Sequence, residues 1–98
     1  METTFADDDY RDLRDDPDAK TAFAKNIVLA YRRVLRTIDD AIDFRDIRAL
    51  KSLRFKRLEG KRKHQHSLRL NDQWRLIVEV QEGNPKTTIR IIKIEDYH

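Results

Sequence analysis

Hydrophobic residues recur every three or four positions from about residue 17 to residue 42. This period is that of one face of an amphipathic helix. Asp16-Pro17 is a typical helix start, because proline is favoured at the first helical position. The sequence therefore predicts a helix over residues 17–42, and a face this broad needs a large partner such as a sheet. The face consists of Phe23, Ile27, Ala30, Val34, Ile38 and Ala41, widened by Tyr31, Leu35 and Ile42.

In the second half of the chain the hydrophobic period changes to two, as in a β-strand. The alternation predicts strands over residues 53–58, 67–70, 73–80 and 87–94, with a turn at Glu82-Gly83-Asn84-Pro85. Before the long helix, residues 1–5 suggest a short strand and residues 6–14 a short acidic helix. This order predicts an α+β fold, a small antiparallel β-sheet packed against N-terminal helices, in a single domain spanning residues 1–98.

The stretch from Ser67 to Leu76, SLRLNDQWRL, is typical of a β-hairpin, and its hydrophobic residues decide the register. A two-residue loop would pair each leucine with a polar residue. A three-residue loop, Asn71-Asp72-Gln73, places Leu68 opposite Leu76 and keeps the hydrophobic side chains on one face. Because a slip of one residue moves every side chain to the other face, we expect the three-residue loop.

This register places Arg69 directly opposite Arg75 on the face of the hairpin that points away from the core. Like charges that are directly opposed destabilise a sheet. A bound anion would remove the conflict, and guanidinium groups suit phosphate oxygens. The alternative is that both side chains extend into solvent or pair with Glu79 or Asp96.

Charge is distributed unevenly along the chain. Residues 1–18 carry eight acidic side chains and two basic ones, whereas residues 45–75 carry eleven lysines and arginines and three acidic residues. Such a basic stretch is typical of proteins that bind a polyanion, although a solvated charged face has the same composition.

The composition also narrows the chemistry. The chain has no cysteine, which excludes disulfides and thiolate metal sites. Its three histidines lack the spacing of a structural zinc site, so we expect no metal and no cofactor. No apolar run of about 18 residues and no signal-peptide segment is present, so we expect a soluble, cytoplasmic protein that does not associate with a membrane.

Two further segments carry candidate chemistry. The terminal Glu95-Asp96-Tyr97-His98 joins carboxylates, a phenol and a histidine, which suits proton transfer; a frayed polar tail is the alternative. The basic loop from residue 60 to residue 66 would either follow phosphates or form a solvated turn. We expect His64 and His66, within this loop, to be surface residues rather than a metal pair.

Three segments together resemble HigB toxins of the RelE/ParE superfamily. They are Arg57–Lys63 (RLEGKRK), Ser67–Leu76 (SLRLNDQWRL) and Glu95–His98 (EDYH). The resemblance is close over residues 44–98, and the earlier residues match only in layout. It implies the RelE-like microbial RNase fold and a toxin of a type II toxin–antitoxin system, which cuts mRNA in the A site of a translating ribosome. It also implies neutralisation by a HigA-like helix-turn-helix antitoxin, with operator DNA bound only through the antitoxin complex.

The resemblance implies catalytic roles for five residues. Arg75 follows the tryptophan of the family pattern, and Asp96, Tyr97 and His98 match its terminal Asp-Tyr-His. Lys56 stands where some members have a catalytic histidine, and it would serve as a phosphate clamp or as a proton carrier.

Metal-free RNA cleavage needs a base for the 2′-hydroxyl, a cation for the phosphorane and an acid for the departing 5′-oxygen. We expect Arg75, with Arg69, to stabilise the negative charge and His98 to transfer a proton. Asp96 would orient a neighbouring side chain or favour its charged form. Tyr97 would stack on a base or donate a hydrogen bond. Further phosphate contacts are expected from Arg54, Arg57, Lys61, Arg62 and Lys63.

Two other functions are compatible with the sequence. A ParE-like toxin would inhibit DNA gyrase without cutting RNA, and the terminal Asp-Tyr-His argues against this function. A non-toxic RNA- or DNA-binding module would use its arginines only to hold phosphate.

Overall fold

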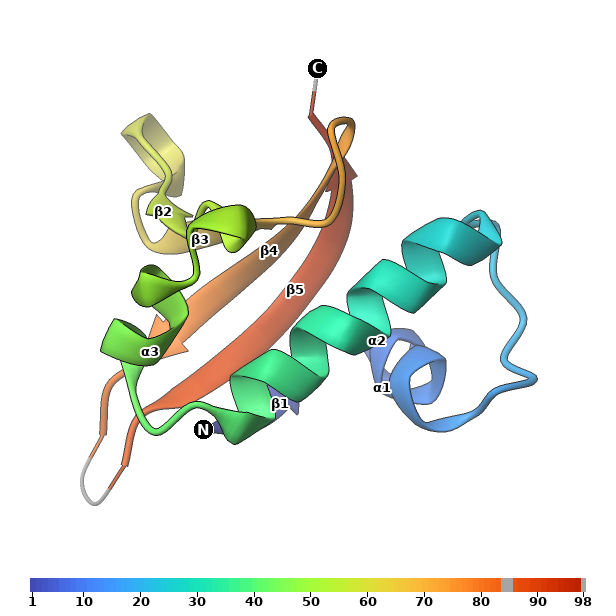
Figure 1. The fold of residues 1–98 in the computed structure, drawn as a ribbon, viewed down its shortest axis with the longest axis horizontal. Coiled ribbons are helices and arrows are strands. Elements are labelled where there is room, and N and C mark those ends of the chain that lie inside the picture. Colours follow the sequence, from blue (N-terminus) through green and yellow to red (C-terminus); the bar gives the residue numbers. More distant parts are fainter. Residues whose placement is uncertain (84–85, 98) are drawn as a thin grey trace.

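The computed structural model describes residues 1–83 and 86–97, and Figure 1 shows how they are arranged. Asn84-Pro85 of the predicted turn and the terminal His98 lie outside the described residues. The helices are α1 (Asp8–Asp15), α2 (Lys25–Asp40) and α3 (Phe44–Ala49), and two 3-10 turns are η1 (Lys51–Leu53) and η2 (Gly60–Arg62). The strands are β1 (Glu2–Phe5), β2 (Lys56–Arg57), β3 (Gln65–Arg69), β4 (Trp74–Gln81) and β5 (Thr88–Asp96).

The strands form one five-stranded sheet in the order β1-β5-β4-β3-β2. Strands β2 to β5 pair antiparallel, as predicted. The short strand β1 pairs with β5 in parallel, so the sheet is mixed rather than purely antiparallel. A parallel pair needs a long crossover connection, and the helices that follow β1 belong to that connection. The predicted α+β class, with N-terminal helices on a small sheet, is confirmed.

Helix α2 lies across one face of the sheet (Figure 1). Its residues Tyr31, Leu35 and Ile38 are at most 1% exposed. The Tyr31 hydroxyl is satisfied because it donates to the Tyr10 carbonyl at 2.8 Å. The sheet contributes Leu68, Leu76, Val78, Ile89, Ile91 and Ile94 to the core beneath α2.

No described helix has the length and apolar character needed to cross a membrane.

The predicted helix over residues 17–42 is wrong at both ends, since α2 begins at Lys25 and ends at Asp40. Asp16 starts a turn instead: its Oδ1 accepts a hydrogen bond from the Asp18 N–H at 2.9 Å, and a residue before proline avoids the helical region. Phe23 lies before the helix, and its ring packs edge-on against Trp74 with centroids 5.8 Å apart. Ile42, which follows the helix, is 87% exposed rather than part of the apolar face.

A bulge in β5 changes which of its side chains face the helices. The β4–β5 register shifts by one residue, and Ile92 is the extra residue of the bulge. Ile91 is buried in the core before the bulge and Ile94 after it. Because bulges redirect the side chains that follow them, Glu95 points to the opposite face and pairs in register with Arg75.

Candidate functional site

The β3–β4 hairpin has the register that its hydrophobic residues predicted. Leu68 pairs with Leu76 and Arg69 with Arg75. The loop is fixed by Asn71, whose Oδ1 accepts hydrogen bonds from the second and third N–H groups after it, both at 2.8 Å. Asparagine favours turns because its side chain bonds to the backbone ahead of it in this way.

The two opposed arginines bind different groups. Arg69 donates through Nη2 to Asp72 Oδ1 in the hairpin loop. Arg75 donates through Nη1 to the carbonyl of Asn71 at 2.6 Å. The conflict between like charges is therefore relieved in part by groups of the protein itself, and an anion bound between the two side chains stays a prediction. The alternative was that both side chains extend into solvent or pair with Glu79 or Asp96, and the structure adds Asp72 as the ion-pair partner of Arg69.

Arg75 and Lys56 meet at the ring of Tyr97. Arg75 is only 7% exposed, and its Cζ lies 4.3 Å from the centroid of the Tyr97 ring, within the range of a cation–π contact. Lys56 Nζ donates to Tyr97 Oη at 3.3 Å and lies 5.3 Å from the same centroid. Strands β2 and β4 and the residue after β5 thus bring three of the five predicted catalytic side chains together.

Arg75 and Tyr97 border a cavity of about 290 Å³ on the face of the sheet opposite the helices, which we call the cleft. Lys56 contacts Tyr97 but is not one of the residues that line the cleft. Four of its residues were not predicted as site residues, although alternation in β3 already places Ser67 on the face of Arg69. The Ser67 Oγ is buried and has no hydrogen-bond partner among the described residues. The cleft is lined by Leu58, Arg62, Ser67, Arg75, Ile77, Glu95, Asp96 and Tyr97.

Glu95 holds two cations at the wall of the cleft. Its Oε2 accepts from Arg62 Nη1 at 3.0 Å, and its Oε1 lies 3.2 Å from Lys93 Nζ. Burial opposes ionisation of Glu95, but the hydrogen bonds from Arg62 and Lys93 outweigh burial and hold its pKa below its ordinary value. Glu95 is therefore an ionised structural partner for Arg62 at neutral pH.

The end of β5 is attached to the hairpin loop. Gln73 Nε2 donates to Asp96 Oδ2 at 3.1 Å, and the Tyr97 N–H donates to the Gln73 carbonyl at 2.6 Å. The chain is thus held as far as Tyr97, which contradicts a frayed tail up to that residue. His98 lies outside the described residues, so its proposed proton transfer stays a prediction.

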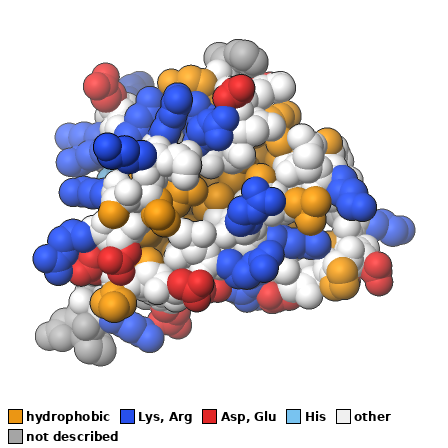
Figure 2. All heavy atoms as spheres, in the orientation of Figure 1, with side chains coloured by type: hydrophobic (Ala, Val, Ile, Leu, Met, Phe, Trp, Pro, Cys, Tyr) orange, Lys and Arg blue, Asp and Glu red, His pale blue; other side chains and the backbone are white. Residues whose placement is uncertain are grey.

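Most of the other predicted phosphate-binding residues lie away from the cleft. Arg57 donates through Nε to the Lys63 carbonyl at 2.6 Å, and both residues line a second cavity. Arg54 is exposed after η1, in the left-handed region with φ 46°, and Lys61 is exposed in η2. Arg62 alone among them lines the cleft. Figure 2 shows lysines and arginines gathered over the part of the molecule that holds β2 and η2.

The two histidines of the basic loop have different partners. His64 Nε2 lies 3.7 Å from Glu79 Oε2, whereas the His66 ring stacks on Phe55. Over residues 1–83 and 86–97, no three histidine, cysteine or acidic side chains are grouped so that they could hold a metal ion.

Solved structures with the same fold include a toxin and a toxin–antitoxin complex. A YoeB/ParE toxin from Agrobacterium tumefaciens has a TM-score of 0.59 at 12% identity, with 100% of both chains covered. The YoeB dimer from Staphylococcus aureus has a TM-score of 0.54 at 20% identity, covering 100% of this chain and 97% of that one. The toxin–antitoxin complex RelBE2 from Mycobacterium tuberculosis has a TM-score of 0.51 at 18% identity, covering 98% and 96%. No curated protein matches the sequence.

The sequence itself matches a family over most of its length. The model of the HigB-like toxins, described as the RelE-like toxin of the type II toxin-antitoxin system HigB, matches residues 3–92. This range includes the helices, the hairpin with the Arg69–Arg75 pair, and Lys56 in β2. The chain therefore belongs to the HigB-like family, the RelE-like toxins of type II toxin–antitoxin systems.

Proposed function

We propose that this toxin is a metal-independent endoribonuclease that cuts mRNA bound to the ribosome and thereby inhibits translation and arrests growth. Ribosome-dependent cleavage of mRNA is typical of the family to which the chain belongs. The cleft supports the proposal because it combines cations with hydrogen-bonding groups beside a concave surface.

The observation that carries the proposal is the buried guanidinium of Arg75. Arg75 is 7% exposed, and its Nη1 donates to the carbonyls of Asn71 and Trp74. A buried charge is costly unless another charge or strong hydrogen bonds compensate it. Two backbone carbonyls and the Tyr97 ring compensate it in part. A phosphate oxygen in the cleft would complete its coordination, and this is the position at which a phosphorane develops charge.

Lys56 and Tyr97 would act on the same phosphate. The Lys56 ammonium donates to the phenol oxygen, which leaves the phenol proton free to donate to a phosphate oxygen or a leaving oxygen. Tyr97 is also 48% exposed, so a base of the substrate could stack on its ring. Lys56 thereby serves as a clamp that holds both the phenol and the phosphate in position.

Proton transfer would be completed at the end of the chain. Asp96 accepts a hydrogen bond from Gln73 and would orient His98, whose ordinary pKa near 6.5 suits exchange of protons at neutral pH. Each such acid or base contributes roughly 10²–10⁴-fold. A site of this modest strength suffices when the ribosome holds the messenger in line for attack by its 2′-hydroxyl.

The proposed cellular partners follow from the toxin family. A type II toxin requires an antitoxin, and we propose a HigA-like protein with a helix-turn-helix domain, through which the complex would bind operator DNA. An acidic segment of that antitoxin would suit the basic surface over β2 and η2. The toxin would act in the cytoplasm, where it meets ribosomes and their messengers.

The test is cleavage of a messenger on purified ribosomes, followed by primer extension. We expect new 5′ ends within the codon in the A site, and intact RNA when ribosomes are omitted or when Arg75 is replaced by alanine. Uncut messenger together with broken DNA in cells would overturn the proposal in favour of gyrase inhibition.

A further inference from the structure

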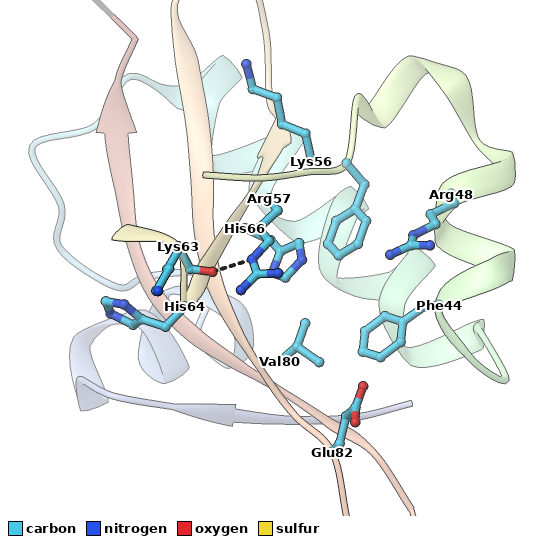
Figure 3. A pocket seen from close by; sticks show the side chains of 10 residues that line it. Phe44, Arg48, Lys56, Arg57, Lys63, His64, His66, Val80 and Glu82 are labelled. Atoms are coloured by element: carbon cyan, nitrogen blue, oxygen red, sulfur yellow. Dashed lines mark hydrogen bonds between the residues drawn. The ribbon is translucent and has the colours of Figure 1, made fainter. Parts of the chain in front are cut away.

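A second, larger cavity lies on the other side of β2. Its volume is about 660 Å³, and Figure 3 shows basic and aromatic side chains around it, together with the carboxylate of Glu82. We call it the aromatic hollow and define it by Phe44, Arg48, Phe55, Arg57, Lys63 and His66. Phe44 and Arg48 come from α3, a short helix that the hydrophobic pattern did not predict.

Three flat rings form a stack in the aromatic hollow. Phe44 and Phe55 have centroids 6.1 Å apart with planes 12° from parallel, and Phe55 and His66 have centroids 4.8 Å apart with planes 6° from parallel. Burial lowers the pKa of His66, and the charges of Arg57 and Arg48 lower it further. His66 is therefore a neutral ring at physiological pH. All three rings are half-buried, so the stack is neither a closed core nor a free surface.

Cations outnumber acidic side chains around this stack. Among the described residues that line the aromatic hollow, Arg48, Lys56, Arg57 and Lys63 are basic, and Glu82 is the one carboxylate. Arg57 is held in place because its Nε donates to the Lys63 carbonyl at 2.6 Å (Figure 3). A fold gains no stability from gathering like charges in this way, whereas a polyanion would neutralise them.

Strand β2 is an edge strand of the sheet, and it lies between the aromatic hollow and the cleft. Lys56 pairs with Ser67, and the next residue, Arg57, pairs with His66. Consecutive side chains of a strand point to opposite faces. The Lys56 ammonium donates to Tyr97, which lines the cleft, and Lys56 also lines the aromatic hollow together with Arg57. A strand of RNA leaving the cleft needs only to cross β2 to enter the aromatic hollow.

We propose that the aromatic hollow is an accessory RNA site, in which one unstacked base lies against the ring stack and neighbouring phosphates contact Arg48, Arg57 and Lys63. Single-stranded nucleic acids are commonly bound by aromatic platforms in basic grooves, because every base has a flat face. An acidic peptide would satisfy the cations but would leave the parallel rings without a matching planar group. The inference rests on the proposed function only in taking RNA as the ligand.

Binding can be measured separately from cleavage. The probe is a fluorescein-labelled single-stranded RNA of twelve nucleotides with 2′-O-methyl groups, which block the attacking hydroxyl. Its affinity for the full-length toxin is measured by fluorescence polarisation at several salt concentrations. Arg48→Ala should weaken binding and reduce the slope of log affinity against log salt by about 0.7, the value for one phosphate contact on a single strand. Arg33→Ala, which removes an exposed arginine from α2, is the matched control and should leave both quantities unchanged.

The ring stack needs a second variant. Phe44→Leu keeps the side chain apolar but removes the ring, and it should weaken binding about fivefold or more, as expected for loss of one stacked base. Thermal unfolding of each variant shows whether the fold is retained, and a 4-thiouridine probe cross-links RNA directly to the folded parent. Cross-linked peptides that contain Phe44 or His66 would support the site. On programmed ribosomes, the cross-linked RNA identifies the source as messenger or ribosomal RNA.

Three outcomes would overturn the inference. They are an Arg48→Ala variant that binds like Arg33→Ala, cross-links confined to the cleft, and variants that lose affinity for the antitoxin while binding RNA like the parent. The last result would identify the aromatic hollow as a protein-binding site. Loss of ribosomal cleavage with retained binding in the aromatic hollow would refute the proposed enzyme but not this site.

Discussion

Arg69 and Arg75 lie directly opposite each other on β3 and β4, yet their guanidinium groups turn to different partners. Asp72 in the loop forms an ion pair with Arg69, whereas Arg75 lies against the Tyr97 ring in the cleft. The loop carboxylate therefore has a functional consequence, because it separates two like charges and leaves one of them available to a substrate.

The first prediction concerns this loop carboxylate. Asp72→Asn should lower the melting temperature at low salt, because Arg69 then faces Arg75 without its counter-charge. Added phosphate should raise the melting temperature of the variant more than that of the parent, since the freed arginine gives phosphate a second contact. Thermal unfolding with and without phosphate provides the measurement. Asp12→Asn, at an exposed aspartate of α1, is the control, and an equal response of both variants would contradict the prediction.

The hairpin shows how much of the site the sequence could predict. Its register followed from burial alone, because only a three-residue loop keeps Leu68 and Leu76 on one face, and this register placed Arg69 opposite Arg75. Tertiary partners were harder to predict. The side chain of Arg69 donates a hydrogen bond to Asp72 in the loop, and the hydrophobic pattern contains no information about this partner.

Two errors have local physical causes. Asp16-Pro17 has the composition of a helix start, but the Asp16 side chain closes a turn on Asp18, and α2 begins later at Lys25. The aromatic hollow was missed because it depends on α3, which has only 6 residues.

The second prediction concerns pH and Glu95. The pKa of Glu95 in the folded protein lies below its ordinary value of 4.5 because of its bonds to Arg62 and Lys93. Its contribution to stability is therefore present above about pH 4.5 and is lost as the pH falls through the lowered, folded-state pKa. The difference in melting temperature between the parent and Glu95→Gln should be constant near neutral pH and should narrow in acid. Glu59→Gln, at an exposed glutamate, is the control; a difference that widens in acid would refute the ion-pair assignment.

The third prediction concerns Arg75. Arg75→Lys keeps the charge but loses the planar group that overlaps Tyr97 and reaches the Asn71 carbonyl. If the guanidinium stabilises the developing phosphorane, ribosomal cleavage should fall by roughly 10²-fold or more, as for loss of one aligned donor. Single-turnover rates on programmed ribosomes give the comparison, with Arg33→Lys on α2 as the matched control. Parent-like cleavage by a folded Arg75→Lys variant would remove this residue from the catalytic group.

The fourth prediction distinguishes two roles for Lys56. As a clamp, it needs only a positive charge near the phosphate and Tyr97, so Lys56→Arg should keep most of the activity and Lys56→Ala should lose it. As a proton carrier, it must exchange a proton, which arginine does not do at neutral pH, so both variants would be inactive and the parent rate would show a titration that they lack. The 3.3 Å bond from Lys56 Nζ to Tyr97 Oη favours the clamp, because it uses one of the ammonium protons to hold the phenol in place. We therefore expect rescue by arginine and an unchanged dependence of the cleavage rate on pH. An inactive Lys56→Arg variant that still binds ribosomes would instead make Lys56 the proton carrier.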